Sequence, residues 1–178
     1  MSANASIDHF LADLAGAVHR DDRGTLADLR CSFSEATSHR AWPHLAAYCD
    51  LRDPRTRAIW SVIGAGFATL APDGLARSSV GNIGATMRKL ALGDGKVDEK
   101  RLASFESRFR RLLTCSGVEE LCEHLVSVVR AAKAKGVTID FRKLYEDLMA
   151  WENQSVRIEW ATAYWGARTT AKAQGETV

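Results

Sequence analysis

The residues best suited to metal or acid–base chemistry lie in the segment EELCEHL, residues 119–125. A ferritin-like di-metal bundle needs Glu-x-x-His, with the two residues three apart, on facing helices. Here Glu120 and His124 are four apart, and the chain holds no second copy of the segment. The patterns HExxH, GxSxG and GxxxxGK[ST] are also absent. We therefore predict no catalytic residue, no metal site and no cofactor, and so a protein that is not an enzyme.

The cysteines do not favour a metal site either. No CxxC pair occurs among the four cysteines, Cys31, Cys49, Cys115 and Cys122. A structural zinc site is therefore disfavoured, and buried thiols are the simpler interpretation. The spacing leaves open whether Cys115 and Cys122 pair with each other.

A glycine motif at residues 81–84 has the composition of a phosphate loop. It follows no predicted strand and lacks the third glycine of such loops, so a turn that opens a helix is favoured.

Basic side chains have a clearer pattern over residues 98–114, where 3.6-residue periodicity predicts a helix. At about 100° per residue, Arg101 and Arg108 nearly superpose along one edge of the apolar stripe. Arg111 follows one turn after Arg108, and Lys100 lies further round on the same side. Guanidinium groups at this spacing suit a row of phosphates. A solvated face with salt bridges is the alternative interpretation.

Weaker basic candidates lie elsewhere, and the aromatic residues add little. The tryptophans at helical spacings are typical of a core, although Trp165 points away from Trp160 and could meet a partner. The weaker basic candidates are Arg30, Arg88, Lys89, Arg130, Arg142, Lys143, Arg157 and Arg168.

Composition places these residues in an ordinary globular protein. The chain has 178 residues, 46% hydrophobic and 26% charged, with a net charge of +2. The longest apolar stretch is about a dozen residues, whereas a membrane span needs about 20. The N-terminus lacks the features of a signal peptide. We expect a cytoplasmic protein without membrane contact.

The periodicity predicts an all-α fold of two small helical bundles joined by a short linker at Gly93-Asp94-Gly95. Residues 1–94 form the predicted N-terminal helical domain, and residues 95–178 form a four-helix bundle with a disordered tail after about residue 170. The helices are expected over the stripe 7–18 and over 25–31, 42–48, 54–70, 82–92, 98–114, 118–136, 140–151 and 155–170, with Asp53, Asp98, Asp140, Ser155 and a Ser116–Glu119 capping box at helix starts.

The order and spacing of several stretches resemble the small subunit of the type I-E CRISPR Cascade complex, the CasB family. The likeness covers about residues 20–168, and one departure is Ser107, where a second arginine is common in the family. The stretches are RGTLADLR (23–30), AWP (41–43), GNIG followed by RKL (81–90), FESRFRRLL (105–113), EELCEHL (119–125), IDF through DL to Trp151 (139–151), and Arg157 followed by WA and YW (157–165).

The resemblance implies a non-catalytic subunit that works in antiviral defence. Two copies are expected to lie head to tail in Cascade, touching the backbone subunits that hold the guide RNA and the large subunit. Their basic surface would stabilise the R-loop through phosphates of the target or displaced DNA strand. A helical protein–protein scaffold without nucleic-acid contact is the main alternative, and a metal-dependent helical enzyme is a third. The predicted nucleic-acid-binding residues are Arg30, Arg88, Lys89, Arg108 and Arg157, where family motif and basic site coincide, and Arg101 and Arg111 from the helix-face argument.

Overall fold

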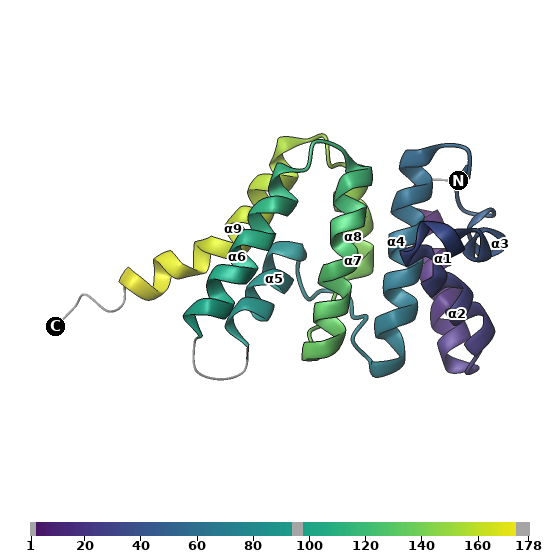
Figure 1. The fold of residues 1–178 in the computed structure, drawn as a ribbon, viewed down its shortest axis with the longest axis horizontal. Coiled ribbons are helices and arrows are strands. Elements are labelled where there is room, and N and C mark those ends of the chain that lie inside the picture. The colour runs from purple at the N-terminus through teal and green to yellow at the C-terminus, as the bar shows by residue number, and fades with distance from the viewer. Residues whose placement is uncertain (1–2, 94–97, 174–178) are drawn as a thin grey trace.

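The computed structural model describes residues 3–93 and 98–173, and over these residues the predicted all-α fold is confirmed (Figure 1). No strand occurs among them, and their one β-type contact is an isolated parallel bridge between Ala76 and Ile139. Three 3₁₀ segments interrupt the order: η1 (Cys31–Phe33), η2 (Glu35–Ala41) and η3 (Ala71–Asp73). The α-helices are α1 (Ala3–His19), α2 (Arg23–Arg30), α3 (Trp42–Leu45), α4 (Pro54–Leu70), α5 (Ile83–Leu92), α6 (Glu99–Thr114), α7 (Val118–Lys135), α8 (Phe141–Met149) and α9 (Gln154–Ala173).

Acidic side chains cap three helices as predicted. The carboxylate of Asp53 accepts hydrogen bonds from two backbone amides at the start of α4. Asp98 does the same for α6, and Asp140 accepts from the Lys143 amide at the start of α8. These caps satisfy amide groups that have no partner within the helix, which is why the sequence signal located them. Asn82 caps α5 in the same way, so the interpretation of residues 81–84 as a helix-opening turn is confirmed.

Two predicted helix caps are wrong, although α7 begins at Val118 as predicted. α7 is preceded by Gly117, which offers no side-chain cap, and Glu120 rather than Glu119 accepts the Ser116 amide at 3.1 Å. α9 begins at Gln154, where the side chain of Asn153, not Ser155, accepts a backbone amide. In both cases a neighbouring residue with equivalent chemistry takes the capping role.

Three other boundaries also differ from the prediction. α2 begins two residues earlier than expected, because Asp22 caps it through the Thr25 amide at 3.1 Å. α3 ends at Leu45 instead of continuing to Tyr48. The helix α9 continues to Ala173, past the predicted start of a disordered tail, and residues 174–178 lie outside the described residues.

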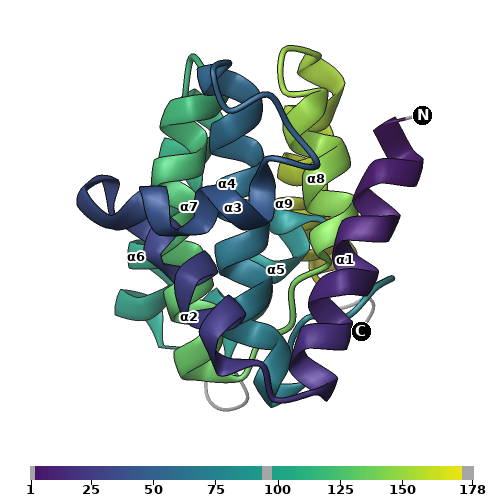
Figure 2. The ribbon, with the colours of Figure 1, turned by 90° about the vertical axis from the view of Figure 1, so that its right-hand side faces the viewer.

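Helices from the two sides of the predicted domain boundary pack against each other. α4 packs against α7 and α8, while α5 packs against α6 and α9 (Figure 1). Figure 2 shows α1, α2 and α3 covering α4 at one end of the molecule. Buried apolar residues from both halves of the chain form one continuous core. The division at residues 94 and 95 stays a prediction, and both residues lie outside the described part of the chain.

A buried carboxylate joins α8 to α9. Asp147, which is 2% exposed, accepts a hydrogen bond from the Trp160 indole at 2.7 Å and pairs with Lys143 at 2.8 Å. Burial raises the pKa of Asp147, while the bonds from Lys143 and Trp160 act in the opposite direction. The donors thus offset part of the desolvation that this carboxylate suffers in the core.

The backbones of α5 and α9 approach closely at Gly84. A Cβ atom at this position would lie 2.0 Å from the carbonyl oxygen of Trp160. Because that atom belongs to helix backbone, it cannot move aside as a flexible side chain would. Glycine is therefore required here for steric reasons, and the crossing of the two helices depends on it.

We predict that Gly84→Ala destabilises the protein by about 1–3 kcal/mol or more, because α5 and α9 must move apart. Gly24→Ala is the matched control. Gly24 lies in α2, where the nearest atom to an added Cβ is 3.6 Å away, so alanine should leave stability unchanged or raise it by up to about 1 kcal/mol. Urea unfolding of both variants gives the comparison. Equal stability of the Gly84→Ala and parent proteins would contradict the proposed steric requirement.

Candidate nucleic-acid interface

One side of α6 carries basic residues without acidic neighbours. Lys100, Arg108 and Arg111 are exposed, and none forms an ion pair with a residue that the structure describes. At about 100° per residue, Lys100 and Arg111 fall in one row, and Arg101 and Arg108 fall in a second row beside it. The two rows extend over about 15 Å of helix axis, at 1.5 Å per residue.

The two acidic residues of this helix, Glu99 and Glu106, lie on the other side. Glu106 pairs with Arg110 at 2.8 Å, one helical turn away, and Arg110 also stacks over the Trp165 ring. Trp165 is half-buried and packs edge-on against Phe109, so its contacts in this chain are those of a core-edge residue. The salt-bridge interpretation therefore applies to Arg110. Arg108 lies over the Phe105 ring at 5.3 Å, and neither Arg108 nor Arg111 is paired with a described carboxylate.

A basic pocket lies beside the start of α6. Its volume is about 550 Å³, and its charged lining residues are Lys89 of α5, Arg101 of α6 and Lys135 of α7. No carboxylate is among the described residues that line it. The fold brings Lys89 and Arg101 together here, and it adds Lys135, which the sequence analysis did not select. In the sequence, Lys135 is marked as a basic residue of the helix end only by its place with Lys133 just before Gly136.

Four of the predicted arginines donate hydrogen bonds to backbone carbonyl groups, and Arg30 does so within its own helix, to Leu26 at 2.9 Å. Arg101 donates to Ala91 at 3.0 Å and also to Leu92, in the last turn of α5. Arg88 donates to the Tyr164 carbonyl oxygen at 3.0 Å. Such groups have no partner within their own helix when they lie in its last turn, so a guanidinium group can satisfy them.

Arg157 is held in the same manner. It donates to the Cys115 carbonyl at 3.1 Å, just after α6, and its guanidinium group lies over the Trp151 ring at 4.7 Å. Arg30 is exposed, but it lies on α2, at the opposite end of the molecule from α6 (Figure 1). The seven predicted residues therefore do not form one continuous track.

Among the weaker basic candidates, two are engaged by carboxylates. Arg142 bonds to Asp8 and Glu146, both at 2.7 Å, and Lys143 pairs with Asp147 and Glu159. Both lie on α8. This helix consequently offers little free positive charge to a polyanion.

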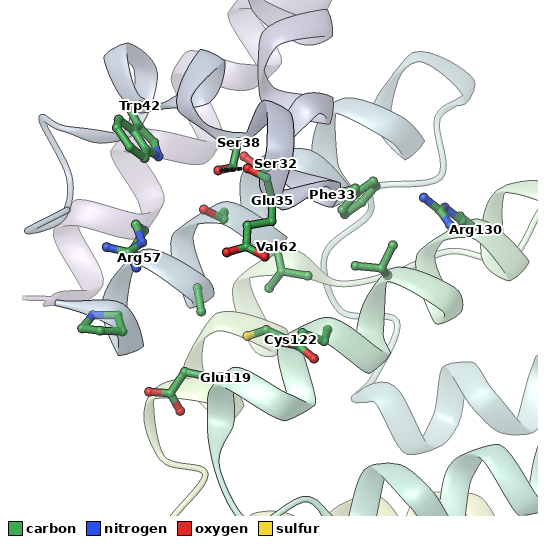
Figure 3. Close-up of a pocket in the computed structure, with 15 residues that line it drawn as sticks. Ser32, Phe33, Glu35, Ser38, Trp42, Arg57, Val62, Glu119, Cys122 and Arg130 are labelled. Atoms are coloured by element: carbon green, nitrogen blue, oxygen red, sulfur yellow. Dashed lines mark hydrogen bonds between the residues drawn. The ribbon is translucent and has the colours of Figure 1, made fainter. Parts of the chain in front are cut away.

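A second pocket, of about 510 Å³, lies between the segment 32–42, α4 and α7 (Figure 3). Its lining includes Trp42, which is 42% exposed, and charged residues of both signs: Glu35, Glu119, Glu123, Arg57 and Arg130. Cys122 also lines it, but burial raises the pKa of that thiol, and no histidine is among the described lining residues. This pocket therefore lacks an activated nucleophile.

The thiols are free in the described chain, and Cys115 does not pair with Cys122. No helix among the described residues has the length and apolar character needed to cross a membrane.

Residues 25–165 match the family model of the CRISPR-associated protein Cse2. The chain belongs to the Cse2 family. The resemblance to type I-E Cascade small subunits that the sequence predicted is thereby confirmed. No curated protein matches this Cse2-family chain by sequence.

Solved structures agree with the family assignment at the level of the fold. A CRISPR-associated protein of the Cse2 family from Thermus thermophilus superposes with a TM-score of 0.69 at 24% identity, over 93% of this chain and 99% of the other. A structure of CasB from the same organism gives 0.65 at the same identity and coverage. A chain of a CRISPR RNA-guided surveillance complex gives 0.68 at 19% identity, over 98% of this Cse2-family chain and 100% of its own length.

We predict that Arg101→Ala destabilises the protein by about 1–3 kcal/mol, because the last carbonyl groups of α5 lose charged donors. Lys89→Ala removes the same charge from the same pocket, and we expect it to change stability by less than about 0.5 kcal/mol, since Lys89 is exposed. Urea denaturation distinguishes the two. Equal losses would show that Arg101 has no capping role.

Proposed function

We propose that this chain is a non-catalytic subunit of a CRISPR RNA-guided surveillance complex of the Cascade type, acting in antiviral defence. Membership of the Cse2 family supports this, as does the shared fold with a chain of such a complex. Its partners are then the backbone and large subunits, a second copy of itself, guide RNA and target DNA. No catalytic role is assigned to any of its residues.

We further propose that the exposed side of α6 contacts the phosphate backbone of the target or displaced strand. The observation that carries this is the set of exposed cations, Lys100, Arg108 and Arg111, that no described carboxylate neutralises. Lys89 and Lys135 extend this surface into the pocket beside α6. A guanidinium group that is exposed and unpaired meets a phosphate without first breaking an internal bond.

The physical effect on the R-loop follows from a near balance of energies. The guide–target hybrid is about as stable as the DNA duplex that it replaces, so a few backbone contacts shift the equilibrium. Sequence choice remains with base pairing, which is consistent with a surface of phosphate-binding groups. In this proposal Arg88, Arg101 and Arg157 position α5, α6 and α9, and Arg30 forms a separate contact at the other end.

Contact with other subunits is the second part of the proposal. The pocket in Figure 3 combines three glutamates and two arginines with an exposed tryptophan, a combination suited to a polar segment of a neighbouring protein that also offers contact to the indole. If the chain is a scaffold only, this surface and not α6 would account for its role in the complex.

We predict that the Arg108→Ala, Arg111→Ala double variant binds single-stranded DNA more weakly than the parent chain. The slope of log K against log salt should fall by about 1.4, at about 0.7 for each phosphate that is no longer neutralised. Fluorescence anisotropy at several salt concentrations measures this slope. The double variant should still co-purify with the other Cascade subunits.

Arg142→Ala is the control for the loss of positive charge, because both neighbours of Arg142 are carboxylates. Its salt slope should equal that of the parent. Unchanged slopes in the double variant, or equal decreases in both proteins, would refute phosphate contact through α6 and leave the scaffold alternative.

A further inference from the structure

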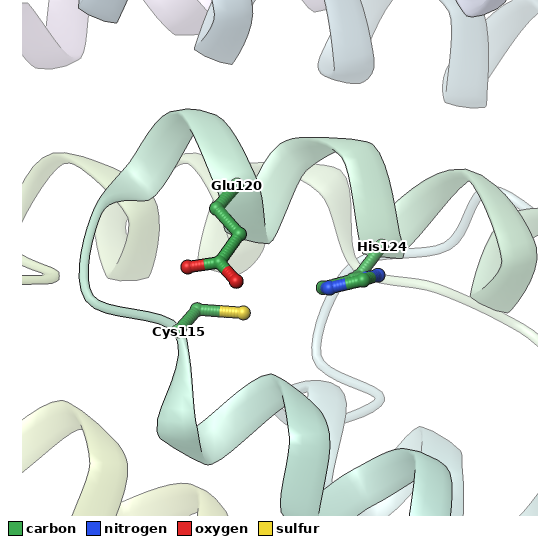
Figure 4. Close-up of side chains that lie close together, drawn as sticks. All are labelled: Cys115, Glu120 and His124. Carbon is green, nitrogen blue, oxygen red and sulfur yellow. The ribbon is translucent and has the colours of Figure 1, made fainter.

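Three side chains with metal-binding atoms meet where α6 turns into α7. Cys115 directly follows α6, and Glu120 and His124 lie one turn apart near the start of α7. The Cys115 sulfur, a Glu120 carboxylate oxygen and a ring nitrogen of His124 all lie within 4.8 Å of one another. Figure 4 shows the three side chains directed into the same space between the two helices.

We propose that Cys115, Glu120 and His124 bind a zinc ion. Thiolate, imidazole and carboxylate groups are the ligands that Zn²⁺ takes in proteins, and three protein ligands with one water molecule form a common tetrahedral site. With metal–ligand bonds of about 2.0–2.3 Å, ligand atoms in such a site are about 3.3–3.8 Å apart. The three groups therefore need to close by about 1 Å.

The burial of the three residues permits that closure. Cys115 is 2% exposed and fixed by the end of α6, whereas His124 is half-buried and Glu120 is exposed. The flexible members of the set can thus move toward the fixed sulfur. One oxygen of Glu120, Oε2, accepts the Ser116 amide at 3.1 Å, which orients the carboxylate.

Binding requires the Cys115 thiol to lose its proton. In the metal-free chain the thiol donates to the Arg111 carbonyl oxygen at 3.3 Å, and burial raises its pKa. On binding, the S–H proton passes to solvent as the sulfur–zinc bond forms, and the hydrated ion gives up all but one of its water ligands as it takes the three protein ligands. The thiolate and the carboxylate then balance the two positive charges of the ion.

The site would join the end of α6 to the beginning of α7. It uses neither the exposed arginines of α6 nor the pocket beside Lys89, so it is independent of the proposed DNA contact. A ligand that binds only the folded chain raises its stability, so zinc should raise the unfolding temperature.

The test uses the full-length protein, incubated with Zn²⁺ or Co²⁺ and then freed of unbound metal. Elemental analysis should give one zinc per chain. The Co²⁺ form should show a thiolate-to-metal charge-transfer band in the near ultraviolet and the visible bands of tetrahedral cobalt. Cys115→Ser should abolish the charge-transfer band, and His124→Ala should lower metal affinity at least about 10-fold.

Matched controls separate this site from other thiols and imidazoles. Cys49→Ser and His39→Ala change the same residue types away from the turn, and both should keep one bound metal and the parent spectrum. Glu120→Gln changes an exposed side chain, so circular dichroism should show an intact fold while metal affinity falls at least about 10-fold. Absence of bound zinc in the parent chain, a cobalt spectrum without the thiolate band, or an unchanged spectrum in Cys115→Ser would each refute the site.

Discussion

The close approach of α5 to α9 is the constraint on which the arrangement of basic residues depends. The Trp160 carbonyl fills the space next to Gly84, and this contact holds α5 between α6 and α9. The last carbonyl groups of α5 then face Arg101, and Arg88 on the same helix reaches α9. Lys89, the next residue along α5, is left exposed beside the pocket. Helix packing thus decides which cations are held internally and which face outward.

Helix ends and polyanions compete for the same arginine groups. The last turn of a helix presents carbonyl oxygens without partners, and a nearby guanidinium group satisfies them with charged hydrogen bonds. Arg101 and Arg157 do this after α5 and α6. Arg108 and Arg111 lie in the middle and last turns of α6, with their side chains toward solvent. A net charge of only +2 is therefore compatible with a local basic surface.

Features set by neighbouring residues could be predicted from the sequence. The all-α fold, the caps at Asp53, Asp98 and Asp140, and the basic side of residues 98–114 all follow from spacing along one helix. Contacts between segments that are distant in the sequence could not be predicted in this way. The carbonyl partners of Arg88 and Arg157, and the placement of Lys135 beside Lys89, depend on how helices cross. The predicted caps of α7 and α9 failed because Glu120 and Asn153, close to the predicted residues, have equivalent capping chemistry.

The turn between α6 and α7 shows the same dependence on tertiary structure. Glu120 and His124 share one side of α7, but only the reversal of the chain after α6 brings the Cys115 sulfur beneath them. Loss of the thiol proton there would remove one hydrogen bond from the Arg111 carbonyl oxygen. That oxygen keeps the Thr114 hydroxyl as a donor at 3.0 Å, so it would not be left without a partner. Metal binding would therefore cost this part of the backbone only a weak thiol hydrogen bond, and the Arg111 carbonyl oxygen would stay hydrogen-bonded.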